Sequence, residues 1–208
     1  MKKLVLASKN RGKIAELERL LATKALNIKI LGLSDFPNMP DVIESGKTLS
    51  QNAWLKAKQI SKFSGLPALA DDSGLFIDVL NGDPGIYSSR WAEYSGVDAK
   101  TRDQLNIEKV LAQMANTPIG KRGAQFRSVL AFYNPTETAQ GYELEQVGEL
   151  AGEISLSPAG VNGFGYDPIF VPHGFNKTLA QLDGGQKDQI SHRGKALRAI
   201  LPYLIEHL

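Results

Sequence analysis

The stretch Leu69-Ala70-Asp71-Asp72-Ser73-Gly74-Leu75 places two adjacent carboxylates between two apolar runs. Residues 67–70 and 75–80 have the apolar, aromatic and β-branched character of strands. Asp, Ser and Gly are common turn residues, so we expect a hairpin tip at the Asp-Asp-Ser-Gly sequence. Because successive strand residues point to opposite faces, Asp71 and Asp72 can share a site only if this turn bends the backbone between them.

Two interpretations of the paired carboxylates stay open. In the first they bind Mg²⁺, which usually takes one or two protein carboxylates and completes its shell with water and substrate phosphate oxygens. Such a carboxylate can also orient or deprotonate a water molecule. In the second the turn is a solvated hairpin tip without chemistry, because its residue types are ordinary in turns.

The composition predicts an α/β protein of one domain or two small lobes. With 208 residues, of which 42% are hydrophobic, the chain can bury a proper core. A formal net charge of +2 argues against a long track for a nucleic-acid polymer, and the absence of cysteine excludes disulfides and zinc–thiolate sites. No apolar run is long enough to span a bilayer. We therefore expect a cytoplasmic protein with no membrane contact.

The chain opens with a predicted strand, a polar loop and a helix. An apolar run covers residues 3–7, the loop Ser-Lys-Asn-Arg-Gly-Lys covers residues 8–13, and apolar residues recur at helical spacing from Ile14 to Leu21. The free N–H groups of the helix start and the basic side chains of the loop attract an anion such as phosphate. The loop has one glycine and no Ser or Thr after Lys13, so it is not a Walker A motif. Its alternative is an ordinary basic connector.

A second strand is expected at residues 27–31, followed by a long loop at 32–46 that carries Pro and Gly. The sequence Thr-Leu-Ser-Gln then matches a capping box and predicts a helix over residues 48–64. Asn52 and Lys56 lie one turn apart on this helix, so they can present an amide and an ammonium to one ligand. A solvated helix face is the alternative.

The second half of the chain predicts a helix, a long hairpin and a final helix. The helix is expected from Thr101, with Gln104 as its capping partner, to about residue 115. Alternating apolar residues predict paired strands at 122–134 and 142–154, and Pro202 predicts a kink or break in the C-terminal helix. No internal repeat or flexible linker interrupts the sequence, so residues 1–208 are expected to form a single two-lobed domain.

Two late segments are candidates for ligand contacts. Glycines alternate with aromatic residues over residues 160–168, where Phe164 or Tyr166 can stack on a base, unless the segment is only a tight aromatic turn. Further on, His192 and Arg193 begin the C-terminal helix and either serve a ligand or form a polar helix start.

Six stretches together resemble the inosine/xanthosine triphosphate pyrophosphatase family, and they span nearly the whole chain in the family's order. They are residues 8–13, 44–46 with 52–57, 70–75, 84–88, 164–170, and 187 with 191–193. The resemblance implies an elongated mixed sheet flanked by helices, with two lobes and a central nucleotide-binding cleft. It also implies a homodimer and Mg²⁺-dependent hydrolysis of deaminated purine nucleoside triphosphates (ITP, dITP, XTP) to the monophosphate and pyrophosphate.

The resemblance assigns roles to individual residues. Glu44 and Asp72 would bind Mg²⁺, with Asp72 as the proton acceptor for the attacking water and Asp71 in support. The loop at 8–13 and Lys56 would hold the triphosphate, Phe164 would stack on the base, and the region of His192 would read its 6-oxo edge. The substrate-binding residues implied in this way are Ser8, Lys9, Asn10, Arg11, Gly12, Lys13, Lys56, Ser73, Phe164, Gly165, Tyr166, Asp167, Lys187, His192 and Arg193.

Two departures from the family pattern and two other functions stay in view. Lys9 stands where family loops more often have glycine, and residues 184–186 replace a more acidic approach to Lys187. The first other function is a pyrophosphatase for a different base. The second is a nucleotide- or RNA-binding regulator without turnover, which has no need for Glu44 and Asp72, because carboxylates facing a phosphate site weaken binding when no metal is present.

Overall fold

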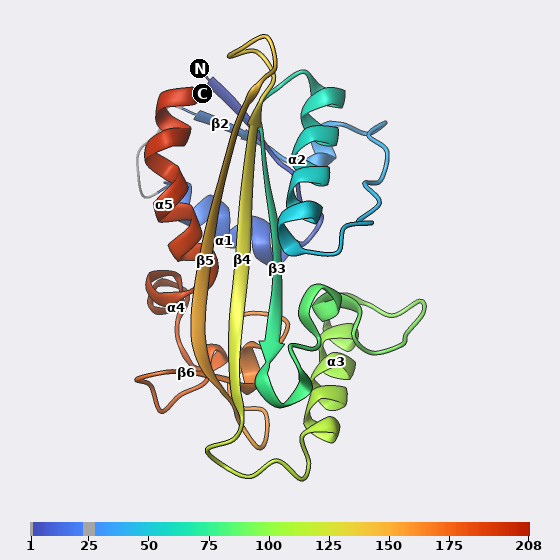
Figure 1. The fold of residues 1–208 in the computed structure, drawn as a ribbon, viewed down its shortest axis with the longest axis vertical. Helices are drawn as coiled ribbons and strands as arrows, with labels where there is room; N and C mark the ends of the chain where they lie inside the picture. The colour runs from blue at the N-terminus through green and yellow to red at the C-terminus, as the bar shows by residue number, and fades with distance from the viewer. Residues whose placement is uncertain (1, 23–27) are drawn as a thin grey trace. The chain divides into compact units, whose positions relative to one another are not determined.

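The structure is a computed structural model that describes residues 2–22 and 28–208. In this part of the chain, six strands form one mixed sheet in the order β2-β1-β3-β4-β5-β6 (Figure 1). β1 pairs in parallel with β2 and β3, and β5 pairs antiparallel with β6. The strand bounds are β1 Lys2–Leu6, β2 Ile28–Leu31, β3 Ala68–Ile77, β4 Gly123–Asn134, β5 Tyr142–Ile154 and β6 Phe170–Pro172.

Helices flank this sheet, which confirms the predicted mixed α/β class. The Thr48 hydroxyl accepts a hydrogen bond of 3.1 Å from the backbone N–H of Gln51, so the predicted cap of α2 is present. None of the helices in the described ranges is long and apolar enough to cross a membrane. The helix bounds are α1 Arg11–Ala22, α2 Leu49–Ser64, α3 Ala99–Gln113, α4 Gly184–Ile190 and α5 His192–His207, with a 3₁₀ helix η3 at Gly85–Arg90.

The chain divides into two compact units. Unit 1 contains Met1–Asp72, Ser128–Gly148 and His192–Leu208, and unit 2 contains Ser73–Arg127 and Glu149–Ser191. β3, β4 and β5 contribute residues to both units, because a unit boundary falls inside each of these strands.

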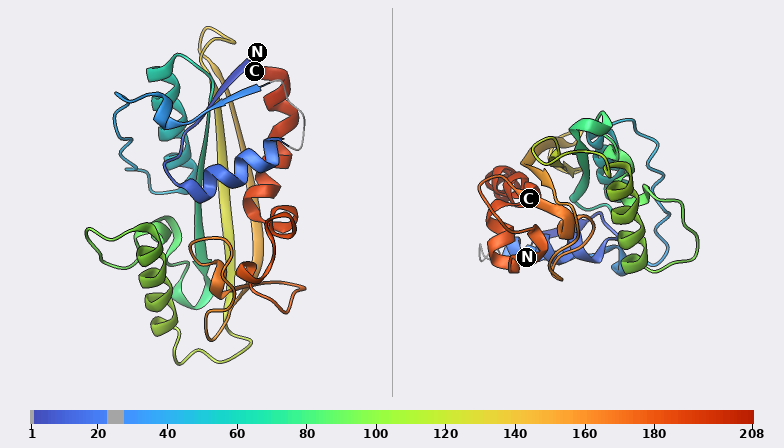
Figure 2. Two further views of the ribbon diagram at one scale, coloured as in Figure 1. Left: turned by 180° about the vertical axis from the view of Figure 1, so that it is seen from behind. Right: turned by 90° about the horizontal axis from the view of Figure 1, so that it is seen from below.

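In unit 1, α1 runs across the strands and contacts α5, and both helices pack on one face of the sheet (Figure 2). Leu17 of α1 and Leu197 of α5 share a buried cluster with Leu4, Leu69 and Phe132 of the strands. Residues at alternate positions of a strand line one face, so Leu69 marks the β3 face that α1 and α5 cover.

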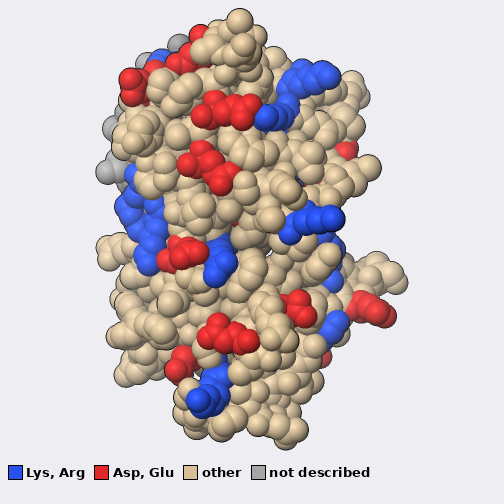
Figure 3. Space-filling model, in the orientation of Figure 1, with Lys and Arg blue, Asp and Glu red and all other residues tan. Residues whose placement is uncertain are grey.

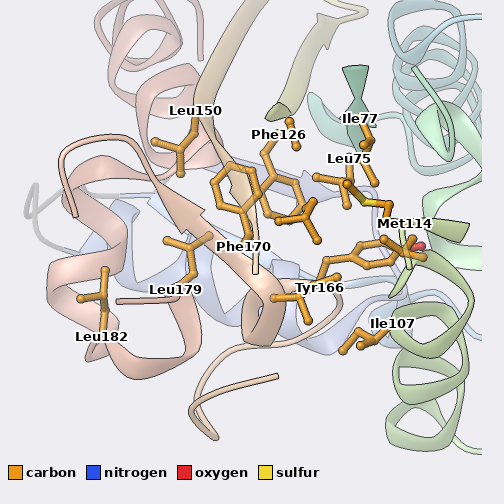
Figure 4. Packing of buried hydrophobic residues seen from close by; sticks show 14 residues of the cluster. Leu75, Ile77, Ile107, Met114, Phe126, Leu150, Tyr166, Phe170, Leu179 and Leu182 are labelled. Carbon is orange, nitrogen blue, oxygen red and sulfur yellow. The ribbon is translucent and has the colours of Figure 1, made fainter. Parts of the chain in front are cut away.

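Unit 2 has a core of its own, built around aromatic rings (Figure 4). The rings of Phe126 and Phe170 are 4.6 Å apart and tilted, which is a favourable arrangement for an aromatic pair. Met114, which directly follows α3, and the Tyr166 ring complete this part of the cluster.

The expected hairpin tip at residues 71–74 is wrong. β3 runs without interruption from Ala68 to Ile77, so Asp71 and Asp72 lie inside one strand. Their side chains therefore point to opposite faces of the sheet, Asp71 toward α1 and α5 and Asp72 toward α2.

Gly74 explains why turn residues occur inside a strand. The carbonyl oxygen of Gly85 approaches so closely that a Cβ at position 74 would collide with it. The Leu75 N–H donates to the Ser88 hydroxyl over 2.8 Å, and that hydroxyl donates to the Gly85 carbonyl over 2.6 Å. Glycine at position 74 thus serves the close approach of η3 rather than a chain reversal.

Several other predicted boundaries need correction. α1 begins at Arg11, so the second half of the predicted 8–13 loop is the first helical turn. Asp98, not Thr101, caps α3, because its carboxylate accepts from the Thr101 N–H over 2.9 Å. The strand expected at residues 75–80 ends at Ile77, and a 3₁₀ helix follows.

The ends of two other predicted elements also differ. The C-terminal segment forms two helices, and α5 continues through Pro202 without a break. Of the predicted strand at 27–31, Asn27 lies outside the described residues and the rest forms β2.

We expect Gly74→Ala to destabilise the protein by roughly 1–3 kcal/mol, because the added methyl group must displace the Gly85 backbone. The matched control is Gly185→Ala in α4, where a Cβ meets its nearest neighbour, Asp183 Oδ1, at an ordinary 3.4 Å. Urea unfolding of both variants checks this. Equal stability of the two variants would contradict a close approach at position 74.

Candidate functional site

A buried cluster of charged groups surrounds Asp71 in unit 1. Its side chain is fully buried and accepts a hydrogen bond of 2.5 Å from the Ser128 hydroxyl. Lys13 Nζ of α1 lies 2.8 Å from Asp71 Oδ2, and Arg193 Nε of α5 lies 3.3 Å from the same oxygen. Arg193 also pairs with the buried carboxylate of Glu16. Two acidic and two basic groups therefore balance one another inside the protein.

The surroundings of Asp71 keep it ionised. Burial by itself raises the pKa of the Asp71 carboxyl, but the adjacent Lys13 ammonium and Arg193 guanidinium outweigh burial and hold the pKa well below its usual range. Burial lowers the pKa of Lys13 more than Asp71 raises it. Asp71 thus ties α1 and α5 to β3, and its role in support of Glu44 and Asp72 stays a prediction.

On the opposite face of β3, Asp72 meets Lys56 of α2. Lys56 Nζ lies 2.7 Å from Asp72 Oδ1, 3.0 Å from Glu44 Oε1 and 2.8 Å from the carbonyl oxygen of Asp71. Burial raises the pKa of Asp72, against the opposing effect of the Lys56 ammonium. Burial lowers the pKa of Lys56, but Asp72 and Glu44 overcome this, so the pKa of Lys56 is raised.

α2 also fixes the segment that carries Glu44. Asn52 Oδ1 accepts from the Gly46 N–H over 2.8 Å, and Gln51 Oε1 accepts from the Lys47 N–H over 2.7 Å. Asn52 is fully buried, so the solvated face considered for it is wrong, and its oxygen holds the backbone two residues after Glu44. A Cβ at position 46 would come within 2.6 Å of that oxygen, which accounts for glycine there.

The positions of Glu44 and Asp72 are compatible with their predicted role as Mg²⁺ ligands. Because one ammonium contacts both carboxylates, an oxygen of each is within reach of a single cation. Among residues 2–22 and 28–208, no group of three or more acidic or histidine side chains is placed to hold a metal. Two carboxylates suffice for Mg²⁺ when water and phosphate oxygens complete its shell.

The predicted phosphate loop lies at the start of α1 in unit 1. The Asn10 side chain accepts from the Lys13 N–H over 3.1 Å, and Ser8 Oγ accepts from the Asn10 N–H over 3.2 Å. These bonds shape the helix start, whereas Lys9 is exposed and pairs with Asp41. Arg11 is exposed and Gly12 half-buried in the first turn. The phosphate contacts of this loop stay predictions.

In unit 2, a second polar cluster shapes the predicted base-binding segment. The buried Asp167 carboxylate accepts from the Phe164 N–H over 2.8 Å and pairs with Lys187 Nζ at 2.6 Å. Lys187 Nζ also lies 4.8 Å from the centre of the Phe164 ring. Asp103 Oδ2 of α3 accepts from the Gly165 N–H over 2.7 Å. Two carboxylates therefore hold consecutive backbone amides of this segment.

The structure separates the two aromatic candidates for base stacking. The Tyr166 ring is buried in the unit 2 core, and its hydroxyl donates to the Ser88 carbonyl over 2.8 Å (Figure 4). The stacking role considered for Tyr166 is therefore wrong. Phe164 is half-buried, so its ring keeps an accessible surface. The alternation of glycine with aromatic residues does not tell which ring enters the core.

The remaining predicted residues lie in defined places. Ser73 is half-buried on β3 in unit 2. His192 is buried at the start of α5 in unit 1, next to Arg193, whose guanidinium contacts Asp71 and Glu16. The contact of Arg193 with a base stays a prediction.

Sequence reasoning missed three residues, Glu16, Asp103 and Ser128. Glu16 had no local signal, because its partner Arg193 is 177 residues away in the chain. Ser128 and Asp103 had none, since their partners are 57 and 62 residues away in the chain.

The charged groups on the surface do not form a single-sign track on the face drawn in Figure 3, where basic and acidic side chains are interspersed. This agrees with the nearly balanced charge of the sequence. The basic groups around Asp71 and Asp72 are mostly buried and paired, so they are a local feature rather than part of a basic surface.

The chain is similar to known proteins along its whole length. The model of the Ham1 family matches residues 4–203. A relative from Streptomyces coelicolor named dITP/XTP pyrophosphatase is 46% identical over 208 residues, which cover 100% of both chains.

Two solved structures share the fold over nearly the whole chain. A HAM1 protein from Coxiella burnetii is 41% identical, with a TM-score of 0.85 over 99% of this chain and 100% of that one. The Ham1 protein of Staphylococcus aureus is 38% identical, with a TM-score of 0.82 over 100% of both chains. These likenesses confirm the family resemblance and the mixed sheet flanked by helices.

We expect Asp71→Asn to destabilise the protein at pH 7 by roughly 3–5 kcal/mol, because the buried charges of Lys13 and Arg193 lose their common partner. Because the pKa of Asp71 is lowered in the folded protein, the ionised carboxylate stabilises the fold at pH values above its ordinary pKa of 3.8. This stabilisation is lost as the pH falls below that value. The difference in the free energy of unfolding between wild type and Asp71→Asn should therefore become smaller below pH 3.8.

Urea unfolding at pH 7 and at acidic pH measures this difference. Asp98→Asn is the matched control, because asparagine keeps the α3 cap and the side chain is exposed. A stability difference for Asp71→Asn that grows on acidification would contradict the assigned role of the carboxylate.

Proposed function

Because the chain belongs to the Ham1 family, we propose that it is a nucleoside triphosphate pyrophosphatase acting on deaminated purine nucleotides. Its substrates would be ITP, dITP and XTP, and its products the nucleoside monophosphate and pyrophosphate. The observation that carries the proposal is the convergence of Glu44, Asp72 and Lys56 in unit 1. The name dITP/XTP pyrophosphatase of a relative 46% identical over the whole chain supports the substrate class.

Glu44 and Asp72 would hold Mg²⁺, which supplies charge neutralisation on the phosphate oxygens when bound. Asp72 would take the proton of the attacking water at one of its carboxylate oxygens. Burial raises the pKa of Asp72, against the opposing effect of the Lys56 ammonium. Asp71 supports this group from the neighbouring position of β3, because its own cluster fixes the strand.

Basic groups of unit 1 would bind the triphosphate, and Lys56 would supply the ammonium next to the carboxylates. In unit 2, Phe164 would stack on the base, with the Lys187 ammonium 4.8 Å from its ring centre. The N–H groups of Phe164 and Gly165 already donate to Asp167 and Asp103. Donors for the 6-oxo group would therefore come from other groups, and His192 and Arg193 stay the predicted ones.

From the family resemblance we also propose a homodimer, and from the lack of a membrane-spanning apolar run in the sequence we propose a cytoplasmic location. Its mass in solution, measured by sedimentation equilibrium, tests the dimer.

We expect Asp72→Asn to reduce turnover at least 100-fold, because it removes both a metal ligand and the proton acceptor. The measurement is pyrophosphate release from ITP, XTP, dITP, ATP, GTP and pyrimidine triphosphates, with Mg²⁺ or with EDTA. Asp98→Asn on the exposed cap of α3 is the control and should keep wild-type turnover.

Each outcome of this panel decides something. Metal-dependent release confined to ITP, XTP and dITP supports the proposal. Turnover of another nucleotide would support a pyrophosphatase activity but would change the base that we assign to its substrate. Tight binding of a nucleotide without turnover would leave a binding protein instead.

We expect Phe164→Ala to raise KM for the preferred nucleotide about 10-fold with little change in kcat, because one stacking contact of about 1–3 kcal/mol is lost. Tyr166→Phe is the control, since it removes only the hydroxyl that donates to Ser88. It should cost about 1 kcal/mol of stability and leave KM unchanged. Steady-state kinetics of both variants check this, and a larger KM effect for Tyr166→Phe would reverse the assignment.

A further inference from the structure

Lys56 contacts three acceptors at once. Its ammonium has three N–H donors, and oxygens of Glu44, Asp72 and the Asp71 backbone lie 3.0, 2.7 and 2.8 Å from Nζ. The Lys56 side chain is 12% exposed, against 49% for Lys58 two residues later on α2. The ammonium is therefore a fixed and mostly buried part of the site.

The two carboxylates that Lys56 bridges are the two proposed metal ligands. A divalent cation needs oxygens of the same groups, so it must displace the ammonium or accept a positive charge beside it. In a partly buried site, where screening by water is weak, two cations at such short range repel strongly. Lys13, in contrast, pairs with Asp71, which is not a proposed ligand.

We propose that Lys56 is an internal competitor of the metal. In the free enzyme its ammonium neutralises Glu44 and Asp72, and the triphosphate of the substrate draws the ammonium to its own oxygens and releases the carboxylates to the metal. Metal and nucleotide then bind cooperatively, and each raises the affinity of the other by the same factor. This inference rests on the proposed function, from which it takes the two metal ligands.

Competition predicts that removal of Lys56 changes the metal affinity in the direction opposite to removal of a group that supports the metal site. Removal of a group that only supports a metal site weakens metal binding, whereas removal of a competing cation strengthens it. Lys56→Met should therefore bind metal more tightly than wild type in the absence of nucleotide, although it loses the ammonium that serves the phosphates.

Electron paramagnetic resonance of free Mn²⁺ measures this without any activity assay, because Mn²⁺ occupies carboxylate and water sites like those of Mg²⁺. We expect the Kd of Lys56→Met to be at least 10-fold lower than that of wild type. Lys56→Arg keeps the positive charge and should stay within about 3-fold of wild type. Lys58→Met is the matched control, since it removes the same charge from α2 at an ion pair with Glu143.

A Lys56→Met protein that keeps its circular dichroism spectrum and binds Mn²⁺ equally or more weakly than wild type would overturn the proposal. An equal gain in affinity for Lys58→Met would also overturn it, because the effect would then come from overall charge. Absence of Mn²⁺ binding in every variant would count against it as well.

A second measurement uses the wild-type protein and does not depend on whether a variant folds. Acetic anhydride labels accessible lysines, and mass spectrometry compares Lys56 with Lys58. Displacement of the ammonium by Mg²⁺ should raise Lys56 labelling several-fold relative to Lys58. Unchanged or lower labelling of Lys56 with Mg²⁺ would contradict displacement.

These measurements distinguish the inference from the proposed function, because neither contains nucleotide. Pyrophosphate release by wild type together with unchanged Mn²⁺ affinity in Lys56→Met would refute the proposed competition and still support the proposed pyrophosphatase activity. Tighter Mn²⁺ binding in Lys56→Met without pyrophosphate release by wild type would support the proposed competition and refute the proposed reaction.

Discussion

The ion pairs of a buried carboxylate, Asp71, hold unit 1 together. An isolated charge in the protein interior is strongly unfavourable, so Asp71 requires its contacts with Lys13, Arg193 and Ser128. Those partners come from α1, α5 and β4, and their contacts fix three elements against β3. Lys13 and Arg193 stand at the starts of their helices, so the same contacts also position the predicted phosphate loop and the start of α5.

The alternation of a β-strand gives the two adjacent aspartates different tasks. Asp71 points to the face covered by α1 and α5, and Asp72 points to the face covered by α2. A carboxylate paired with α1 and α5 and a carboxylate paired with α2 thus follow each other directly in the chain. α2 completes the second arrangement in two ways, because Lys56 contacts both carboxylates and Asn52 holds the segment that carries Glu44.

Unit 2 uses carboxylates in a different way. Asp167 and Asp103 bind backbone N–H groups of the segment around Phe164, and Lys187 balances the buried charge of Asp167. The ring of Tyr166 anchors the same segment in the core. Phe164 is therefore presented by a backbone that is held on both sides, which lowers the entropy that an aromatic contact must overcome.

The sequence by itself determined the mixed α/β class, most element positions and the family, because apolar periodicity, helix caps and six ordered motifs are local signals. It could not determine that residues 71–74 lie inside a strand, because Asp, Ser and Gly are also the residue types that are typical of turns. That outcome depends on distant partners, Arg193 for Asp71 and Gly85 for Gly74. The choice of Phe164 over Tyr166 was likewise made by core packing. Contacts between residues far apart in the chain exist only once the fold has formed, so only the tertiary structure decided them.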